Sequence, residues 1–106
     1  MIYLASPYTH SDPTIMELRF VHVMKVLAEK YLRNGVPAYS PIVHYHDLAK
    51  IYDLPKSHEF WLMHDRAMID VCSEVHVVRL EGWEQSKGVA AEIAYSNEIG
   101  KPIVYV

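Results

Sequence analysis

The sequence has 106 residues, of which 51% are hydrophobic and 22% charged, with 10 Lys and Arg residues against 13 Asp and Glu residues. This length suits one globular domain over residues 1–106 and excludes a separate substrate lobe. The formal net charge of −3 and the absence of a basic run argue against binding to a nucleic-acid backbone, and they favour a small polar ligand.

The cysteine content and the first residues of the chain indicate a compartment. Cys72 is the single cysteine, so no disulfide can form within the chain. The amino terminus runs into an apolar segment with neither a basic leader nor a cleavage site, and no apolar run approaches the ~18 residues of a membrane-spanning helix. We therefore expect a soluble, reduced, cytoplasmic protein with no membrane contact.

Two strands and a long helix are expected in the first part of the chain. Residues 2–5 form a short apolar run before a Ser-Pro pair, which is typical of a buried strand that opens into a loop. Apolar residues recur at helical spacing over residues 13–33, with Asp12 as N-cap and Gly35 beyond the end. Residues 36–40 are expected to form the second strand.

The middle of the chain is less regular. Residues 41–57 have no clean period, and we expect mostly loop there, with one helical turn over residues 46–51. A second major helix is expected over residues 58–71, because one set of apolar residues falls on a single helical face: Phe60, Met63, Ala67 and Val71.

The last part of the chain alternates again between strand and helix. Residues 74–80 are rich in valine and predict a third strand. Residues 86–98 predict a third helix that stops before Gly100, and residues 103–106 predict a last strand.

This alternation predicts an α/β fold, because strands separated by helices pair in parallel through right-handed crossovers. We expect a small three-layer α/β/α sandwich with a four- to five-stranded parallel sheet, flavodoxin-like or Rossmann-like in architecture. Ligands bind such sheets beyond the carboxyl ends of the strands. That rule singles out residues 6–10, 41–46 and 81–88 as the walls of a site.

The start of the third helix is a candidate anion site. Ser86 at the N-cap and Gly88 in the first turn would leave backbone N–H groups and the positive helix end free for a phosphate or carboxylate. An ordinary capped helix with a solvated glycine explains the same residues equally well.

Three carboxylates are candidates for chemistry. Glu92 lies among small apolar residues, so it is either a solvated side chain or a partly desolvated carboxylate at a pocket floor. Asp65 shares a helical face with Trp61, so it is either a surface carboxylate or an acid with a raised pKa that protonates a leaving group. Asp70 competes with Asp65 for that role, although a surface ion pair one turn from Arg66 explains it as well.

Further side chains carry open alternatives. His44 and His46 form a His-x-His pair, but no third ligand with recognised zinc spacing accompanies them, so a metal-dependent hydrolase is the weaker hypothesis. Tyr3 is expected in the core, where its phenol needs a hydrogen-bond partner such as a carboxylate. Arg19 is either a solvated charge or a bidentate phosphate ligand.

Four segments in order along the chain resemble the nucleoside 2-deoxyribosyltransferase superfamily. They are Ile2-Tyr3-Leu4-Ala5-Ser6-Pro7, the helix that holds Asp65, Ser86-Lys87-Gly88-Val89-Ala90-Ala91-Glu92, and Gly100-Lys101-Pro102-Ile103. The chain looks closest to a small uncharacterised branch found in phages and bacteria, in which Gly-Trp-x-x-Ser-x-Gly precedes the glutamate.

The resemblance implies cleavage or exchange of an N-glycosidic bond through a covalent sugar intermediate on a glutamate. It implies that Glu92 is the nucleophile, that Tyr3 orients it, and that Asp65 contacts the base, with Asp70 as a competing match. No cofactor or metal is implied. The candidate residues for binding substrate and its phosphate are Ser6, Arg19, His44, Trp83, Ser86 and Gly88.

One departure from the superfamily bears on the substrate. Members that accept free nucleosides carry an aspartate in Asp-Ser-Gly-Thr where this chain has Ser86. An uncharged serine is similar to the branch that hydrolyses nucleoside 5′-monophosphates, because a carboxylate there would repel a phosphate. The resemblance therefore implies a nucleotide substrate.

Two further expectations follow. The chain also fits a non-catalytic nucleotide-binding sensor, because it is short and lacks the sugar-binding aspartate. A domain of this size closes a pocket with difficulty, and the chain stops directly after its last strand, so we expect a homodimer or higher homo-oligomer with shared sites.

Overall fold

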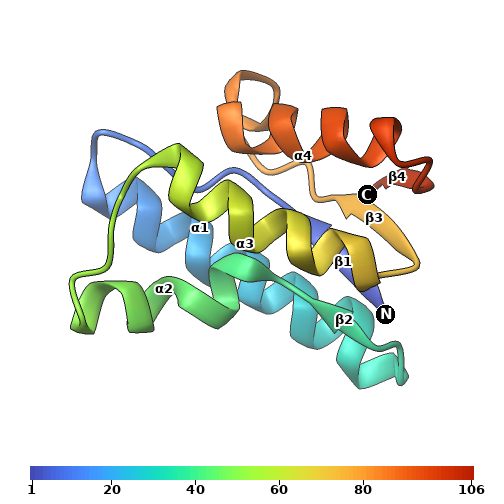
Figure 1. Ribbon diagram of the computed structural model, residues 1–106. Helices are drawn as coiled ribbons and strands as arrows, with labels where there is room; N and C mark the ends of the chain where they lie inside the picture. The colour runs from blue at the N-terminus through green and yellow to red at the C-terminus, as the bar shows by residue number, and fades with distance from the viewer.

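A computed structural model describes residues 1–106 and arranges them around a four-stranded sheet (Figure 1). The strands lie in the order β2-β1-β3-β4, and every neighbouring pair is parallel. Their bounds are β1 (Ile2–Ala5), β2 (Ala38–Tyr39), β3 (Glu74–Val77) and β4 (Ile103–Tyr105). The predicted parallel α/β fold is therefore confirmed, with four strands.

Helices connect each strand to the next. They are α1 (Pro13–Val26) with the π-helical turn η1 (Leu27–Tyr31) and the 3-10 turn η2 (Leu32–Asn34), α2 (Pro41–Ile51), α3 (His58–Val71), the 3-10 turn η3 (Trp83–Gln85) and α4 (Lys87–Glu98). None of them combines the length and the apolar character that crossing a membrane would require.

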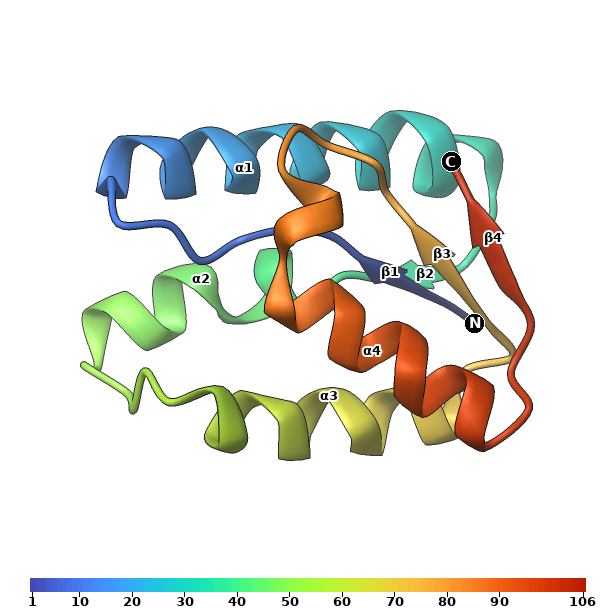
Figure 2. The same cartoon turned by 90° about the horizontal axis from the view of Figure 1, so that it is seen from above.

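The sheet is packed between two helical layers. Figure 2 shows α1 along one side of the sheet, with α3 and α4 along the other. Alternation along β1 supplies both cores, since Leu4 packs with Leu27 and Tyr31 on one face, whereas Tyr3 packs with Ile69 on the other. The chain is thus an α/β/α sandwich, as predicted.

The first helix has the limits that the sequence predicts. The Asp12 side chain accepts a hydrogen bond from the backbone N–H of Thr14 at 2.9 Å, and Pro13 occupies the first turn. Gly35 ends the helical segment in a left-handed conformation with φ of 72°. The predicted helix over residues 13–33 is confirmed, although its last two turns change pitch.

The prediction of mostly loop over residues 41–57 is correct for residues 52–57 but wrong for residues 41–51, which form α2. Ser40 caps this helix by accepting a hydrogen bond from the Val43 N–H at 3.2 Å, and Pro41 fills the first turn. The helix buries a histidine, His46, instead of a row of aliphatic side chains. A hydrophobic period is therefore hard to see in its sequence.

Helix α3 has the predicted bounds, but its predicted inner face is wrong. Met63 is 62% exposed and Val71 is 71% exposed, whereas Ile69 is completely buried. The helix packs its other side on the sheet, so the face shared by Trp61, Asp65 and Ile69 points inward.

The predicted strands are shorter in the structure. The strands expected over residues 36–40 and 74–80 shorten to β2 and β3, and the strand expected over residues 103–106 loses one residue.

Ile69→Ala and Val71→Ala test this orientation of α3. Ile69→Ala removes buried atoms between α3 and the sheet, so the free energy of unfolding should fall by about 2–5 kcal/mol. Val71→Ala, the matched control on the exposed side, should change it by less than ~0.5 kcal/mol. Urea denaturation of both variants measures these values, and a larger loss for Val71→Ala would contradict the packing.

Candidate functional site

A cavity of about 880 Å³ lies at the carboxyl ends of the strands, where the order of the sheet reverses between β1 and β3. Each of the three segments indicated by the sheet rule contributes to its wall, through Ser6, Pro41 and Ser86 among others. Helix α3 adds Trp61 and Asp65. Residues far apart in the sequence therefore meet here as the parallel topology predicts.

Glu92 occupies the inner end of this cavity. The first half of α4 places its side chain against β1, where it is 4% exposed and accepts a hydrogen bond from the Tyr3 hydroxyl at 2.5 Å to Oε2. Tyr3 is itself completely buried, and no lysine, arginine or histidine forms an ion pair with Glu92. A hydrogen bond from Tyr3 thus holds a carboxyl group that has no cationic partner in one orientation.

Asp65 and Glu92 behave as a pair of carboxyl groups. Burial raises the pKa of Asp65 to about 6, although the nearby Tyr3 hydroxyl acts to lower it. Burial also raises the pKa of Glu92 well above 4.5, and the negative charge of Asp65 raises it further. The ionisation of each group therefore depends on the other, and such a pair offers one potential acid and one potential nucleophile.

The amino end of α4 forms the wall next to Glu92. Ser86 is the N-cap, and its Oγ accepts a hydrogen bond from the Val89 N–H at 3.2 Å. A Cβ added at Gly88 would lie 3.8 Å from Ser86 Oγ and 4.0 Å from Glu92 Oε1. Glycine at this position therefore keeps the approach to both groups open.

Ser6 gives independent evidence that this wall faces a polar ligand. It follows β1, lines the cavity and is 6% exposed. Its hydroxyl is the one buried side-chain polar group without a hydrogen-bond partner. Buried hydroxyl groups are nearly always satisfied, so an unpaired one in a cavity indicates a position where a ligand or water completes the bond.

Arg19 lies outside the cavity wall and joins two of the loops that form it. Its guanidinium donates to the carbonyl oxygens of Thr9 at 3.1 Å and Glu81 at 3.4 Å. It also lies against Gly82, which has a φ of 88° and where any Cβ would collide with the guanidinium. In this structure Arg19 holds the loop after β1 to the loop after β3.

Three other predicted residues lie away from the cavity. His44 packs beside Tyr39 and Tyr45, and Trp83 packs against Tyr105. Asp70, the competitor of Asp65, is exposed and accepts a hydrogen bond from Tyr95 at 2.5 Å. Only Asp65 of these two aspartates faces the cavity.

Helix α2 places His44 and His46 of the His-x-His pair on different sides of the helix. Residues two positions apart point to different sides of a helix, so His46 turns into the cavity wall while His44 does not. No group of three His, Cys, Asp or Glu side chains is placed to hold a metal ion.

The sequence indicated no individual role for Tyr8, Glu17 or Tyr45, although the expected wall segments 6–10 and 41–46 include Tyr8 and Tyr45. Tyr8 and Glu17 line the cavity beside His46, and Tyr45 and Trp61 add aromatic surface. The signal that could have found them is the Ser40-Pro41 cap, because a helix starting there brings Tyr45 and His46 to the carboxyl end of the sheet. Glu17 had no such signal, since its partner lies 29 residues away.

A family model described as "Domain of unknown function (DUF1937)" matches residues 1–106 of the chain. The chain belongs to this family. A search of curated proteins found no match to this DUF1937 domain.

Glu92→Gln should stabilise the DUF1937 domain at neutral pH. Folding raises the pKa of Glu92, so the folded state binds more protons than the unfolded state, and stability falls as the pH rises above about 4.5. Glutamine keeps an acceptor for Tyr3 without the charge. We expect a gain of about 0.5–2 kcal/mol at pH 8 and almost none at pH 4.

Thermal unfolding between pH 4 and pH 8 measures this difference. Glu98→Gln, an exposed carboxylate on the same helix, is the control and should leave the pH profile unchanged. Equal shifts in the two variants, or a destabilised Glu92→Gln at pH 8, would show that Glu92 carries no buried charge.

Proposed function

We propose that this DUF1937 domain acts on the N-glycosidic bond of a nucleoside 5′-monophosphate, by hydrolysis or by transfer, through a covalent glycosyl intermediate on Glu92. The single observation that carries the proposal is the oriented, unneutralised Glu92 carboxyl group in the cavity. Tyr3 binds Oε2, and Oε1 lies beside the open position at Gly88. The sequence resemblance to the nucleoside 2-deoxyribosyltransferase superfamily supports the same reaction.

The first step uses the carboxylate as a nucleophile. Glu92 Oε1 forms a bond to the anomeric carbon while the bond from that carbon to the base nitrogen breaks, and the electron pair of that bond leaves with the base. Positive charge develops on the sugar, and the unneutralised carboxylate stabilises it. Asp65, with its pKa raised to about 6, or a water delivers the proton that the leaving base requires.

The second step releases the sugar. Water attacks the anomeric carbon, the ester bond to Glu92 breaks, and the carboxylate is restored as the water loses a proton to the carboxylate form of Asp65 or to solvent. A second base in place of water would complete a transfer by the same route.

The amino end of α4 is the proposed place for the phosphate. Backbone N–H groups and the positive end of the helix dipole favour an anion there, and Lys87 adds a formal positive charge to the cavity wall. The unpaired Ser6 hydroxyl supplies a donor for a phosphate oxygen. Ser86 carries no charge that would repel the ligand.

Base release from nucleotides tests the reaction. A panel of ribonucleoside and deoxyribonucleoside 5′-monophosphates is incubated with the protein, and free base is measured by chromatography. Glu92→Ala should lower kcat/KM about a thousandfold or more, because it removes the nucleophile. Asp65→Asn should lower it by about 100-fold or more.

Glu98→Gln is the control and should keep full activity. No base release from any nucleotide, or release that is the same in Glu92→Ala, would overturn the proposal. Addition of a second free base distinguishes transfer from hydrolysis.

A non-catalytic nucleotide-binding module is the second candidate. Burial and Asp65 raise the pKa of Glu92, and a protonated Glu92 cannot attack carbon. Thermal stabilisation by nucleoside monophosphates without base release favours this candidate. Absence of any thermal shift would contradict both functions.

We also propose a cytoplasmic homo-oligomer that shares its sites between subunits. The buried, unpaired Cys72 and the wide cavity of a small domain are compatible with it. A monomer in sedimentation at micromolar concentration would contradict the shared site.

A further inference from the structure

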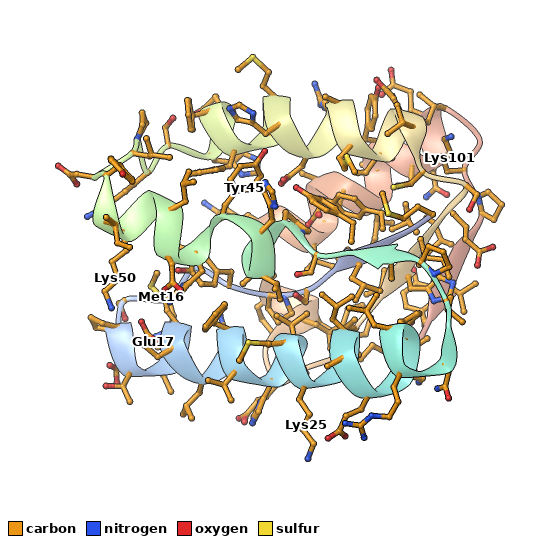
Figure 3. The ribbon with its side chains drawn as sticks, turned by 90° about the horizontal axis from the view of Figure 1, so that it is seen from below. Met16, Glu17, Lys25, Tyr45, Lys50 and Lys101 are labelled. Carbon is orange, nitrogen blue, oxygen red and sulfur yellow. The ribbon has the colours of Figure 1, made fainter.

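Four side chains form a continuous hydrogen-bonded chain beside the cavity. The Tyr8 hydroxyl lies 2.5 Å from His46 Nδ1, and His46 Nε2 lies 3.0 Å from Glu17 Oε1. Lys50 Nζ donates to the same Glu17 oxygen at 3.1 Å. Figure 3 shows Glu17 of α1 and Lys50 of α2 pointing toward each other across the gap between the helices.

Packing fixes the imidazole at the centre of this chain. The His46 side chain is 4% exposed. Phe20 stacks on its ring with centroids 4.0 Å apart and planes 14° apart, and the Tyr8 ring meets its edge. The imidazole therefore cannot turn to exchange its two nitrogen atoms without disturbing the contact between α1 and α2.

The partners of His46 determine where its proton lies. The Lys50 hydrogen bond lowers the pKa of Glu17, so this carboxylate is ionised and can only accept hydrogen bonds. A second carboxylate, Asp47, lies 4.0 Å from the same Nε2. In the neutral form of the imidazole, the proton therefore lies on Nε2, and Nδ1 is left with a lone pair.

This arrangement sets the hydrogen-bonding character of Tyr8. Burial raises the pKa of Tyr8, so the phenol keeps its proton at neutral pH. That proton is donated to His46 Nδ1, since Nδ1 has only a lone pair to offer. Tyr8 is a residue of the cavity wall, and its oxygen then has lone pairs but no hydrogen to offer a ligand.

We propose that Tyr8 is a specificity-determining residue that accepts a hydrogen bond from an N–H or O–H group of the ligand. His46 and Glu17 are positioning residues that hold Tyr8 as an acceptor. A phosphate or a carboxylate has no donor to offer and is disfavoured at this wall, in contrast to the amino end of α4.

The identity of the donor rests on the function proposed above. In a nucleoside monophosphate, such a donor is either an N–H of the base, on the exocyclic amino group or on the ring, or a hydroxyl of the sugar. Both would pair with the same phenol oxygen.

The proton positions are tested in the free protein, without any ligand. Nitrogen-15 NMR of the imidazoles, with His46→Gln used to assign the signals, should show a protonated Nε2 and an unprotonated Nδ1 for His46 at neutral pH. Tyr8→Phe should shift the His46 Nδ1 signal toward the value of an unprotonated nitrogen that accepts no hydrogen bond. A protonated Nδ1 would overturn the proposal, whatever the protein's function.

Matched ligands test the acceptor role. Dissociation constants are measured in a Glu92→Gln background, which prevents turnover, for deoxyadenosine, deoxyguanosine and deoxycytidine monophosphates. Each is compared with an analogue in which hydrogen replaces the amino group and with one in which hydrogen replaces the 3′-hydroxyl. Loss of the donor that meets Tyr8 should weaken binding about fivefold, as expected for one net hydrogen bond.

Tyr8→Phe in the same background should remove the difference in dissociation constant between that nucleotide and the analogue that lacks the donor. Tyr52→Phe, an exposed phenol outside the cavity wall, should retain it. The pair that responds identifies the donor as base or sugar.

If the Tyr8→Phe variant still binds the nucleotide more tightly than its analogue by the same factor, the acceptor role of Tyr8 is overturned and the proposed function is not. Absence of binding by every nucleotide overturns the proposed function and, with it, the nucleotide as the ligand of Tyr8.

Discussion

The burial of the Glu92 carboxyl group against Tyr3 is the interaction on which the site depends. It joins the first strand to the last helix, across 89 positions of the sequence. A buried carboxyl group without a cation costs stability, and the Tyr3 hydroxyl offsets only part of that cost. The hydrophobic core around Tyr3, with Val75 and Ile69, supplies the rigidity that keeps the carboxyl group in place.

The rest of the cavity follows from the order of the strands. Because the connection after β1 leads to β2 on one side and the connection after β3 leads to β4 on the other, the loops after β1 and β3 separate and leave an opening. Arg19 holds the loop after β1 to the loop after β3 through their carbonyl oxygens. An arginine outside the cavity thus determines the spacing of residues that line it.

The two ends of the wall differ in hydrogen-bonding character. The amino end of α4 and the unpaired Ser6 hydroxyl offer donors, which suit an anion. The Tyr8 oxygen, held by His46, offers an acceptor. A ligand with an anionic group and a separate N–H or O–H donor satisfies both ends, and a nucleotide has this combination.

Much of the fold could be predicted from local sequence. The bounds of α3 and the caps of α1 and α4 follow from Ser57, Asp12 and Ser86, because a capping side chain bonds within its own first turn. The inner face of α3 could not be predicted in this way, since both sides carry apolar residues and only the sheet selects Ile69 over Val71. Helix α2 was missed because its buried side is aromatic and polar.

The sequence by itself determined the parallel α/β class, the three segments around the cavity, and the candidates Glu92, Tyr3 and Ser86. The fold class and the three segments depend on local periods, on capping and on the rule that ligands bind at the carboxyl ends of strands. The three candidate residues depend on the sequence resemblance to the nucleoside 2-deoxyribosyltransferase superfamily. Only the tertiary structure separated Asp65 from Asp70, moved Arg19 to a supporting position and joined Tyr8 to His46 and Glu17. Those distinctions depend on which side chains from distant elements come within hydrogen-bond distance, and no local pattern contains that information.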